Sequence, residues 1–426
     1  MITGARSKRR RPRRGVRIAL ATAVVAALIA VAAAVWTYAR RDIESLDVLR
    51  ARATEAIAAG RFDAAGALLE RIERRATTPT ASDILLRAQY LVARGRPDDA
   101  IALARTIDDA DPLAAQARLL EGRVELRRDR VRFAERALLK AAALDPKLVP
   151  PRRELIVIYG MRTQRREVEE QFAALSRIDM LSFDNVLHWS LLHGVVWDPA
   201  EVEPDLARYV AADPDDRVSR LALADCLRQL NRFDEAEKTL RTLSNDDADA
   251  RAIRARIAFD QHRDEAFDRL VEGGPRDHPG LALLRGKVAL SRRDAAEAER
   301  CYRIAWQANP DDREAVFGLG RALLMLGRAV EAKPLLDKSR GIDEQISLLQ
   351  RVLAPDGRNP QLVRALGAAC AAVDRLDEAR GWYNLAISRD PLDVEAQRAV
   401  FRIDARIRAR DAAKRANDVE NRGEHP

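Results

Sequence analysis

The chain has 426 residues, more than a single ordinary hydrophobic core, which indicates several domains or one extended repeat body. Hydrophobic residues make up 47% of the sequence and aromatic residues only 5%, mainly Ala and Leu with few strand-like alternations, which predicts an all-α protein. The formal net charge is +8, but eight of the 74 Lys and Arg residues lie in residues 1–17, which leaves 66 against 66 Asp and Glu. The rest of the chain is neutral, and this argues against nucleic acid as a partner.

An apolar segment follows this basic tail. Residues 18–38 contain only two polar side chains, both threonine, and a helix of this length roughly matches a hydrocarbon core of about 30 Å. We therefore expect a single transmembrane helix in the cytoplasmic (inner) membrane, with residues 1–17 in the cytoplasm and the repeat body outside it, by the positive-inside rule. A cleaved signal peptide is the alternative. The length of the apolar segment, and Arg40 and Arg41 directly after it, favour an uncleaved anchor.

Asp-Pro and Asn-Pro steps punctuate the rest of the chain at regular intervals. Pro112 and Pro146 are 34 residues apart, and Pro146 and Pro214 are 68 apart, which is twice that period. Pro310 and Pro391 are 81 apart, or two periods and about 13 further residues. A period of 34 residues is typical of a repeated helical hairpin.

Small and large residues recur in register with these prolines. In the repeats that fit the pattern best, the first helix has a glycine and the second helix an alanine, where two helices that touch tolerate no bulk. A proline ends the unit. This pattern resembles the tetratricopeptide repeat family, as found in single-pass membrane-anchored bacterial proteins. The residues that carry the resemblance are Gly122, Ala134, Pro146, Gly286, Ala298, Pro310, Gly320, Gly367, Ala379 and Pro391.

The resemblance implies an α-solenoid of about ten hairpins after the N-terminal helix. The repeat from Val149 lacks the small residues and is expected to be degenerate, as a bend or a boundary between two subarrays. The expected segments are repeats over 45–182 and 183–344, an inserted short helix and turn over 345–359, a repeat over 360–391, a capping helix over 392–416 and a disordered tail over 417–426.

No constellation typical of catalysis occurs in the sequence. It has no phosphate-binding loop or dinucleotide fingerprint, so we expect neither an enzyme nor a cofactor. His188 and His193 are five residues apart, whereas a helical metal pair prefers three or four, so no metal site is expected. The three cysteines are far apart and are expected to pack in the core.

The concave surface is the expected site of partner binding. The resemblance implies that one face of each first helix lines this surface. Cations on that face would favour an acidic protein or peptide partner. The predicted function is a scaffold for envelope assembly, secretion or complex biogenesis; the alternative is a regulatory or substrate-feeding subunit of an enzyme complex. The oligomeric state and the identity of the partner stay open. The candidate partner-binding cations are Arg123, Arg127, Arg153, Arg256, Lys287, Arg321 and Arg364.

Overall fold

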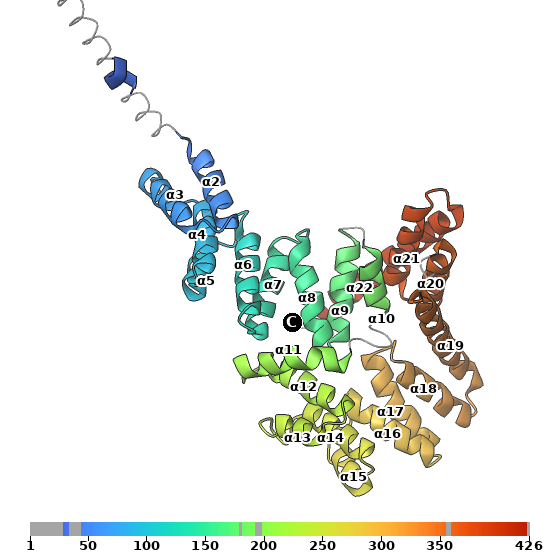
Figure 1. Ribbon diagram of the computed structural model, residues 1–426. Helices are drawn as coiled ribbons and strands as arrows, with labels where there is room; N and C mark the ends of the chain where they lie inside the picture. Colours follow the sequence, from blue (N-terminus) through green and yellow to red (C-terminus); the bar gives the residue numbers. More distant parts are fainter. Residues whose placement is uncertain (1–28, 34–43, 179–180, 192–197, 355–358, 424–426) are drawn as a thin grey trace, which may run out of the picture. The chain divides into compact units, whose positions relative to one another are not determined.

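The computed structural model describes residues 29–33, 44–178, 181–191, 198–354 and 359–423 (Figure 1). The chain separates into two compact units, Met1–Leu113 and Ala114–Pro426. Throughout the described residues the secondary structure is helical, with no strand. This agrees with the all-α fold expected from composition and period.

The first unit consists of two helical hairpins. Leu49, Leu69 and Ile72 are buried between them and form a small core with their neighbours. Apart from a helical stretch over 29–33, the predicted transmembrane segment 18–38 lies outside the described residues. Among the described helices, none is long and apolar enough to cross a bilayer. The helices of this unit are α2 (Leu46–Ala58), α3 (Phe62–Arg75), α4 (Ala81–Ala93) and α5 (Pro97–Ala104).

The second unit continues the same hairpin pattern over a longer array. Its helices are α6 (Ala114–Leu126), α7 (Val131–Leu144), α8 (Val149–Met161), α9 (Arg165–Ser176), α10 (Phe183–Leu191), α11 (Pro199–Ala212), α12 (Arg217–Gln229), α13 (Phe233–Leu240), α14 (Ala248–Asp260), α15 (Asp264–Glu272), α16 (Pro279–Ser291), α17 (Ala295–Ala308), α18 (Arg313–Met325), α19 (Ala329–Val352), α20 (Pro360–Ala372), α21 (Leu376–Arg389) and α22 (Val394–Gly423).

The predicted glycines lie where the two helices of a hairpin touch. A Cβ atom on Gly286 would come within 2.9 Å of the Tyr302 ring, and one on Gly367 would come equally close to the Tyr383 ring. Real Cβ atoms essentially never approach another atom so closely, so each glycine makes room for a tyrosine of the second helix. The alanines predicted at the same contact, Ala134, Ala298 and Ala379, are fully buried.

The turn between the two helices of a hairpin has a left-handed residue in each hairpin whose turn is described. Glycine occupies this place at Gly60, Gly95 and Gly327. Six other hairpins place a residue with a side chain there, at some conformational cost. These residues are Asp129, Thr163, Asn231, His262, Arg293 and Asp374.

The hairpin pattern is interrupted at α10. This helix packs chiefly against α21 and α19 rather than against α11, its neighbour in sequence. The polar ends of α7 and α8 instead meet residues near the C-terminal end of α11, where Arg132 binds Asp213 at 2.8 Å. Beside it the buried Arg162 pairs with Asp216 at 3.3 Å and with Glu135 at 2.7 Å. The interruption follows directly on the repeat from Val149, which lacks the small residues.

Helix α10 contacts α21, and nearby contacts involve α9 and α19, so an early part of the second unit packs against its last hairpin. We call this set of contacts the closure interface. The indole Nε1 of Trp382 donates to Ser190 Oγ at 2.8 Å, between residues 192 positions apart. Ser190 in turn donates to the buried carboxylate of Glu378. Phe183 meets the Trp382 ring edge-on, with centroids 5.7 Å apart. The interface therefore combines an aromatic contact with buried hydrogen bonds.

Two segments differ from the sequence-based expectation. Residues 345–352 do not form a separate inserted helix but continue α19, which is 24 residues long. Buried Leu348, Leu349 and Val352 lie at helical spacing along this extension, so its apolar side packs in the core. The capping helix α22 extends to Gly423, so residues 417–423, which were expected to be disordered, continue the helix.

Candidate binding surface

Most of the predicted partner-binding cations already hold a carboxylate. Arg123 pairs with Glu154 at 2.6 Å, and Lys287 pairs with Glu314 at 2.6 Å. In both pairs the cation and the acid lie on the first helices of successive hairpins. The other such pairs are Arg256 with Asp225 at 3.7 Å, and Arg364 with Asp393 at 3.2 Å and Glu395 at 3.0 Å.

The same arrangement recurs at positions that the sequence did not single out. Arg217 binds Asp247 at 2.7 Å and Asp249 at 2.6 Å, both on or next to the following first helix. A hydrogen bond from His278, with a further one from Arg217, lowers the pKa of the Asp249 carboxyl despite its partial burial. Arg228 reaches Asp260 in the same way at 2.6 Å. We call this series of pairs between successive first helices the ion-pair ladder.

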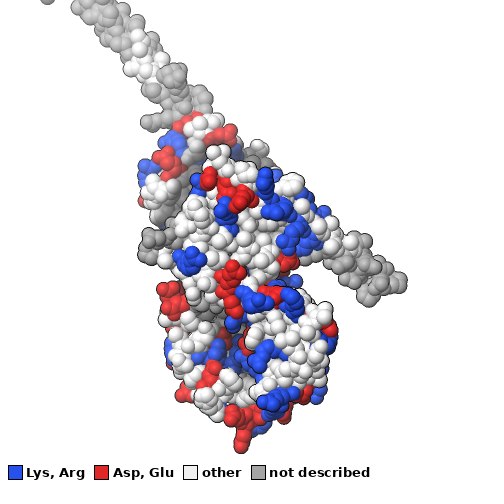
Figure 2. All heavy atoms as spheres, turned by 90° about the vertical axis from the view of Figure 1, so that its right-hand side faces the viewer, with Lys and Arg blue, Asp and Glu red and all other residues white. Residues whose placement is uncertain are grey.

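The ladder changes what the predicted cations can do. A guanidinium that binds a neighbouring carboxylate has less charge to offer a partner, because the pair has to be opened or shared first. Figure 2 shows basic and acidic side chains interleaved over the visible face. Arg127, Arg153 and Arg321 are exposed, and Arg321 lies 5.7 Å from the ring centroid of Phe317. The role of all these cations in partner binding stays a prediction.

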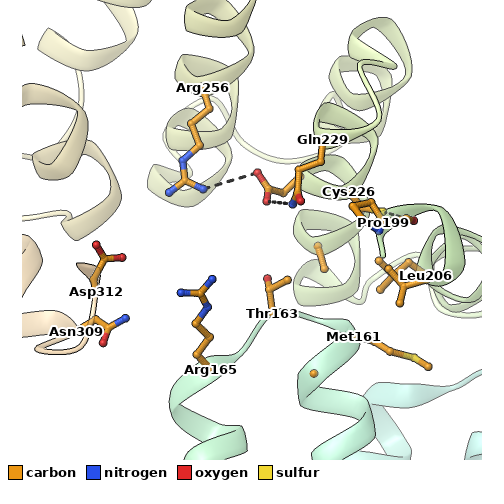
Figure 3. A pocket seen from close by; sticks show the side chains of 14 residues that line it. Met161, Thr163, Arg165, Pro199, Leu206, Cys226, Gln229, Arg256, Asn309 and Asp312 are labelled. Atoms are coloured by element: carbon orange, nitrogen blue, oxygen red, sulfur yellow. Dashed lines mark hydrogen bonds and ion pairs between the residues drawn. The ribbon is translucent and has the colours of Figure 1, made fainter. Parts of the chain in front are cut away.

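A pocket of about 490 Å³ lies in the second unit between α8, α9, α11, α12, α14 and the turn before α18 (Figure 3). We call the side of the second unit on which these elements face one another its inner side. The turn after α8 contributes Thr163, and α9 contributes Arg165. Across from them, the turn before α18 contributes Asn309 and Asp312. Figure 3 shows the Arg165 side chain extending into the space between Arg256 and Asp312. Hairpins that are distant in sequence therefore share this pocket.

The polar groups of the pocket are suited to recognition. Arg165 is exposed, and its side chain makes no hydrogen bond or ion pair with any described residue. The Gln229 amide donates to Asp225 at 2.9 Å and remains exposed beside it. These donors and acceptors fit the polar groups of a polypeptide.

The pocket contains no activated nucleophile. Burial raises the pKa of the Cys226 thiol to about 11, and this thiol donates to the Pro199 carbonyl at 3.1 Å. The group is therefore a protonated thiol at neutral pH. All three cysteines are free and buried, as the sequence predicted.

The described residues do not contain a group of three or more His, Cys, Asp or Glu side chains placed to hold a metal ion. His193, one of the two histidines considered in the sequence, lies outside the described residues. Next to His188, the ring of Trp189 is buried and stacks on Phe172, with centroids 5.2 Å apart. Trp189 therefore fills space in the core.

Sequence reasoning missed Arg165 and the closure interface. Arg165 lies at the start of a second helix, outside the face of the first helices that the repeat pattern marks as concave. It becomes part of the pocket only because the fold places α12, α14 and the turn before α18 opposite it. A single repeat carries no signal for such a contact.

Comparisons with known proteins agree with the hairpin architecture. Two tetratricopeptide repeat models match the chain, one over residues 198–280 and the other over residues 85–148 and 283–345. These matches support the tetratricopeptide repeat family. No curated protein matches the sequence.

Several solved structures resemble the chain at low identity. A tetratricopeptide repeat protein from Parabacteroides merdae is 15% identical, with 57% of this chain and 98% of that chain covered and a TM-score of 0.31. Yeast Tom70 is 12% identical, with 88% and 91% covered and a TM-score of 0.31. The Cut9–Hcn1 hetero-tetramer of APC/C is 11% identical, with 86% and 98% covered and a TM-score of 0.31. At these TM-scores the likenesses carry no argument about function.

Proposed function

We propose that this chain, with its tetratricopeptide repeats, is a non-enzymatic scaffold that binds other proteins through the inner side of its second unit. The observation that carries the proposal is the pocket at Arg165, where hairpins distant in sequence present exposed polar groups to one space. Repeat arrays of this family are in general protein-interaction modules, and their extended inner surfaces suit polypeptide ligands.

We further propose that residues 18–38 anchor this scaffold in the cytoplasmic membrane, with the repeats outside the cytoplasm. The support is the sequence itself, since eight cations precede an apolar segment of the right length and mixed charges follow it. In that place the scaffold would serve envelope assembly, secretion or the biogenesis of a membrane complex.

Two reporter fusions after Pro426 test the orientation. Alkaline phosphatase folds only outside the cytoplasm and is expected to be active, whereas a fluorescent protein that matures only in the cytoplasm should stay dark. The reverse result would overturn the proposed orientation, and release of both fusions from membranes would indicate a cleaved signal peptide.

Site-specific crosslinking tests the binding surface. A photoreactive phenylalanine at Gln229, in the pocket, is expected to capture a defined partner in cells. The same group at Lys238, exposed on α13, is the matched control. Equal crosslinking from both positions, or none from Gln229, would contradict the assignment of the pocket. Mass spectrometry of the captured protein also tells whether the partner is itself an enzyme, as the alternative function requires.

A further inference from the structure

A second hollow lies between α20, the first helix of the last hairpin, and the capping helix α22, which follows that hairpin in the place of a further first helix. It has a volume of about 890 Å³ and is formed by α20 and α22, with Tyr383 of α21 at its base. Its residues are Gln361, Arg364, Ala365, Ala368, Tyr383, Glu395, Gln397, Arg398, Ala399, Phe401 and Arg402. The two helices lie one repeat apart, so the hollow continues the surface on which the ion-pair ladder lies.

The charges of this hollow differ from those of the ladder. Arg398 and Arg402 are exposed, and neither side chain makes a hydrogen bond or ion pair with any described residue. Arg364 is the third cation, and it already holds Asp393 and Glu395. Glu395 is the one acid that lines the hollow. Two arginines are therefore available to a partner here.

The hollow also has an apolar side. Ala365, Ala368 and Ala399 leave room where larger residues would fill the space. Phe401 is 73% exposed, which is unusual for a large aromatic side chain on a helix that packs against a core. A partner that buries this ring gains hydrophobic free energy beside the two guanidinium groups.

We propose that this hollow binds an acidic peptide segment of a partner protein, with carboxylates on Arg398 and Arg402 and an apolar side chain against Phe401. The inference rests on the proposed scaffold function and names the chemistry of one partner segment. Planar guanidinium groups hold carboxylates with two parallel hydrogen bonds, and this favours Glu and Asp over neutral side chains. Outside residues 1–17 the chain has as many acidic as basic residues, which favours a peptide over nucleic acid. The alanines beside Phe401 leave space in which an apolar side chain of that peptide can pack.

The test measures binding of defined peptides to the full-length chain in detergent by fluorescence anisotropy. The probe is a labelled peptide in which pairs of Glu alternate with Leu, and the matched peptide has Gln in place of Glu. We expect the Glu peptide to bind about tenfold more tightly, since two exposed ion pairs of this kind together amount to about one factor of ten. The difference should shrink as salt rises.

Charge reversal gives the decisive variant. R398E/R402E is expected to lose the preference for the Glu peptide and to prefer a peptide with Lys in place of Glu. R408E/R415E changes the same charge on exposed positions of α22 outside the hollow, and it should bind as the original chain does. Equal thermal melts of both variants exclude a folding effect.

The outcomes separate this inference from the proposed function. Equal binding of the Glu and Gln peptides, or an unchanged preference in R398E/R402E, overturns the acidic-peptide site. The basic tail 1–17 also binds polyanions, so single-stranded DNA and anionic vesicles are compared between the original chain and R398E/R402E. A larger loss of binding for DNA or vesicles than for the Glu peptide in that variant overturns the site as well. Failure of crosslinking at Gln229 overturns the assignment of the Arg165 pocket as a binding surface but leaves the peptide measurement unaffected.

Discussion

The hairpin contacts and the closure interface both join two helices closely, but they use different side chains to do so. Within a hairpin, a glycine of the first helix faces a large side chain of the second helix, and Gly286 with Tyr302 and Gly367 with Tyr383 have the same distances to a tenth of an ångström. At the closure interface a tryptophan, a serine and a glutamate make a hydrogen-bonded contact between α10 and α21 that no other pair of helices repeats among the described residues. One contact is periodic and the other is unique.

The difference explains which contacts a sequence reveals. A periodic contact leaves a signal at every period, because the same small residue is needed each time. A unique contact leaves only buried polar residues that a repeat would not need, here Ser190 and Glu378. Such residues are costly to bury unless they are paired, so they indicate a contact without naming its partner.

The largest expected effect is at the closure interface. Trp382 is fully buried, and its replacement by Ala is expected to destabilise the second unit by about 3–5 kcal/mol, since it opens a large cavity and leaves Ser190 without its indole partner. Chemical denaturation followed by circular dichroism measures the loss. Phe401→Ala is the control, because that ring is exposed and its loss should be nearly neutral. Equal midpoints for both variants would mean that the closure contact contributes nothing.

The hairpin contacts come next. Gly286→Leu and Gly367→Leu are expected to cost about 1–3 kcal/mol or more, because a side chain at these positions displaces a tyrosine ring. Thermal melts compare them with Arg408→Ala, a change at an exposed position that should have almost no effect. If the two glycine variants had the same melting temperature as Arg408→Ala, the hairpin contact would not be at these residues.

The ion-pair ladder predicts a dependence on pH. Charged partners lower the pKa of the Asp247 and Asp249 carboxyls, so in acid the unfolded chain takes up protons that the folded chain does not. The stability from these pairs is complete above the unfolded value of about 3.9 and is lost as the pH falls further. Melting temperatures between neutral pH and about pH 3 should show this fall. Arg217→Ala removes the partner that the two carboxyls share and should reduce this fall, while His278 still holds Asp249. An unchanged profile would exclude Arg217 as a cause.

The smallest expected effect is at a turn. Arg293 has a φ of 62°, a left-handed conformation that glycine adopts at lower cost. Arg293→Gly should therefore raise the stability by up to about 1 kcal/mol. Arg292→Gly, one residue earlier at the end of α16, is the control and should lower the stability, because its φ of −81° suits any residue. A loss of stability in both variants would refute the argument.

The sequence predicted the helical class, the hairpins and the residues at their contacts, because these follow from local spacing. It could not predict that Arg123 and Lys287 would be paired. The acids that bind them lie one repeat further along the chain, and the pattern within a single repeat does not show which side chains of the next repeat come within reach. It also divided α19 at residue 345, where the period fails although the helix continues. The pocket at Arg165 depends on contacts between distant hairpins, and no local pattern specifies them.

The closure interface also constrains the order of events during synthesis. Ser190 leaves the ribosome 192 residues before Trp382 does. At a typical elongation rate of about 5–20 residues per second, α10 waits on the order of 10–40 s for its partner helix. During that time Val186, which later contacts α21 beside Gly381, lacks that covering surface. A nascent chain that stalls between α11 and α20 therefore presents an apolar site of the kind that chaperones bind.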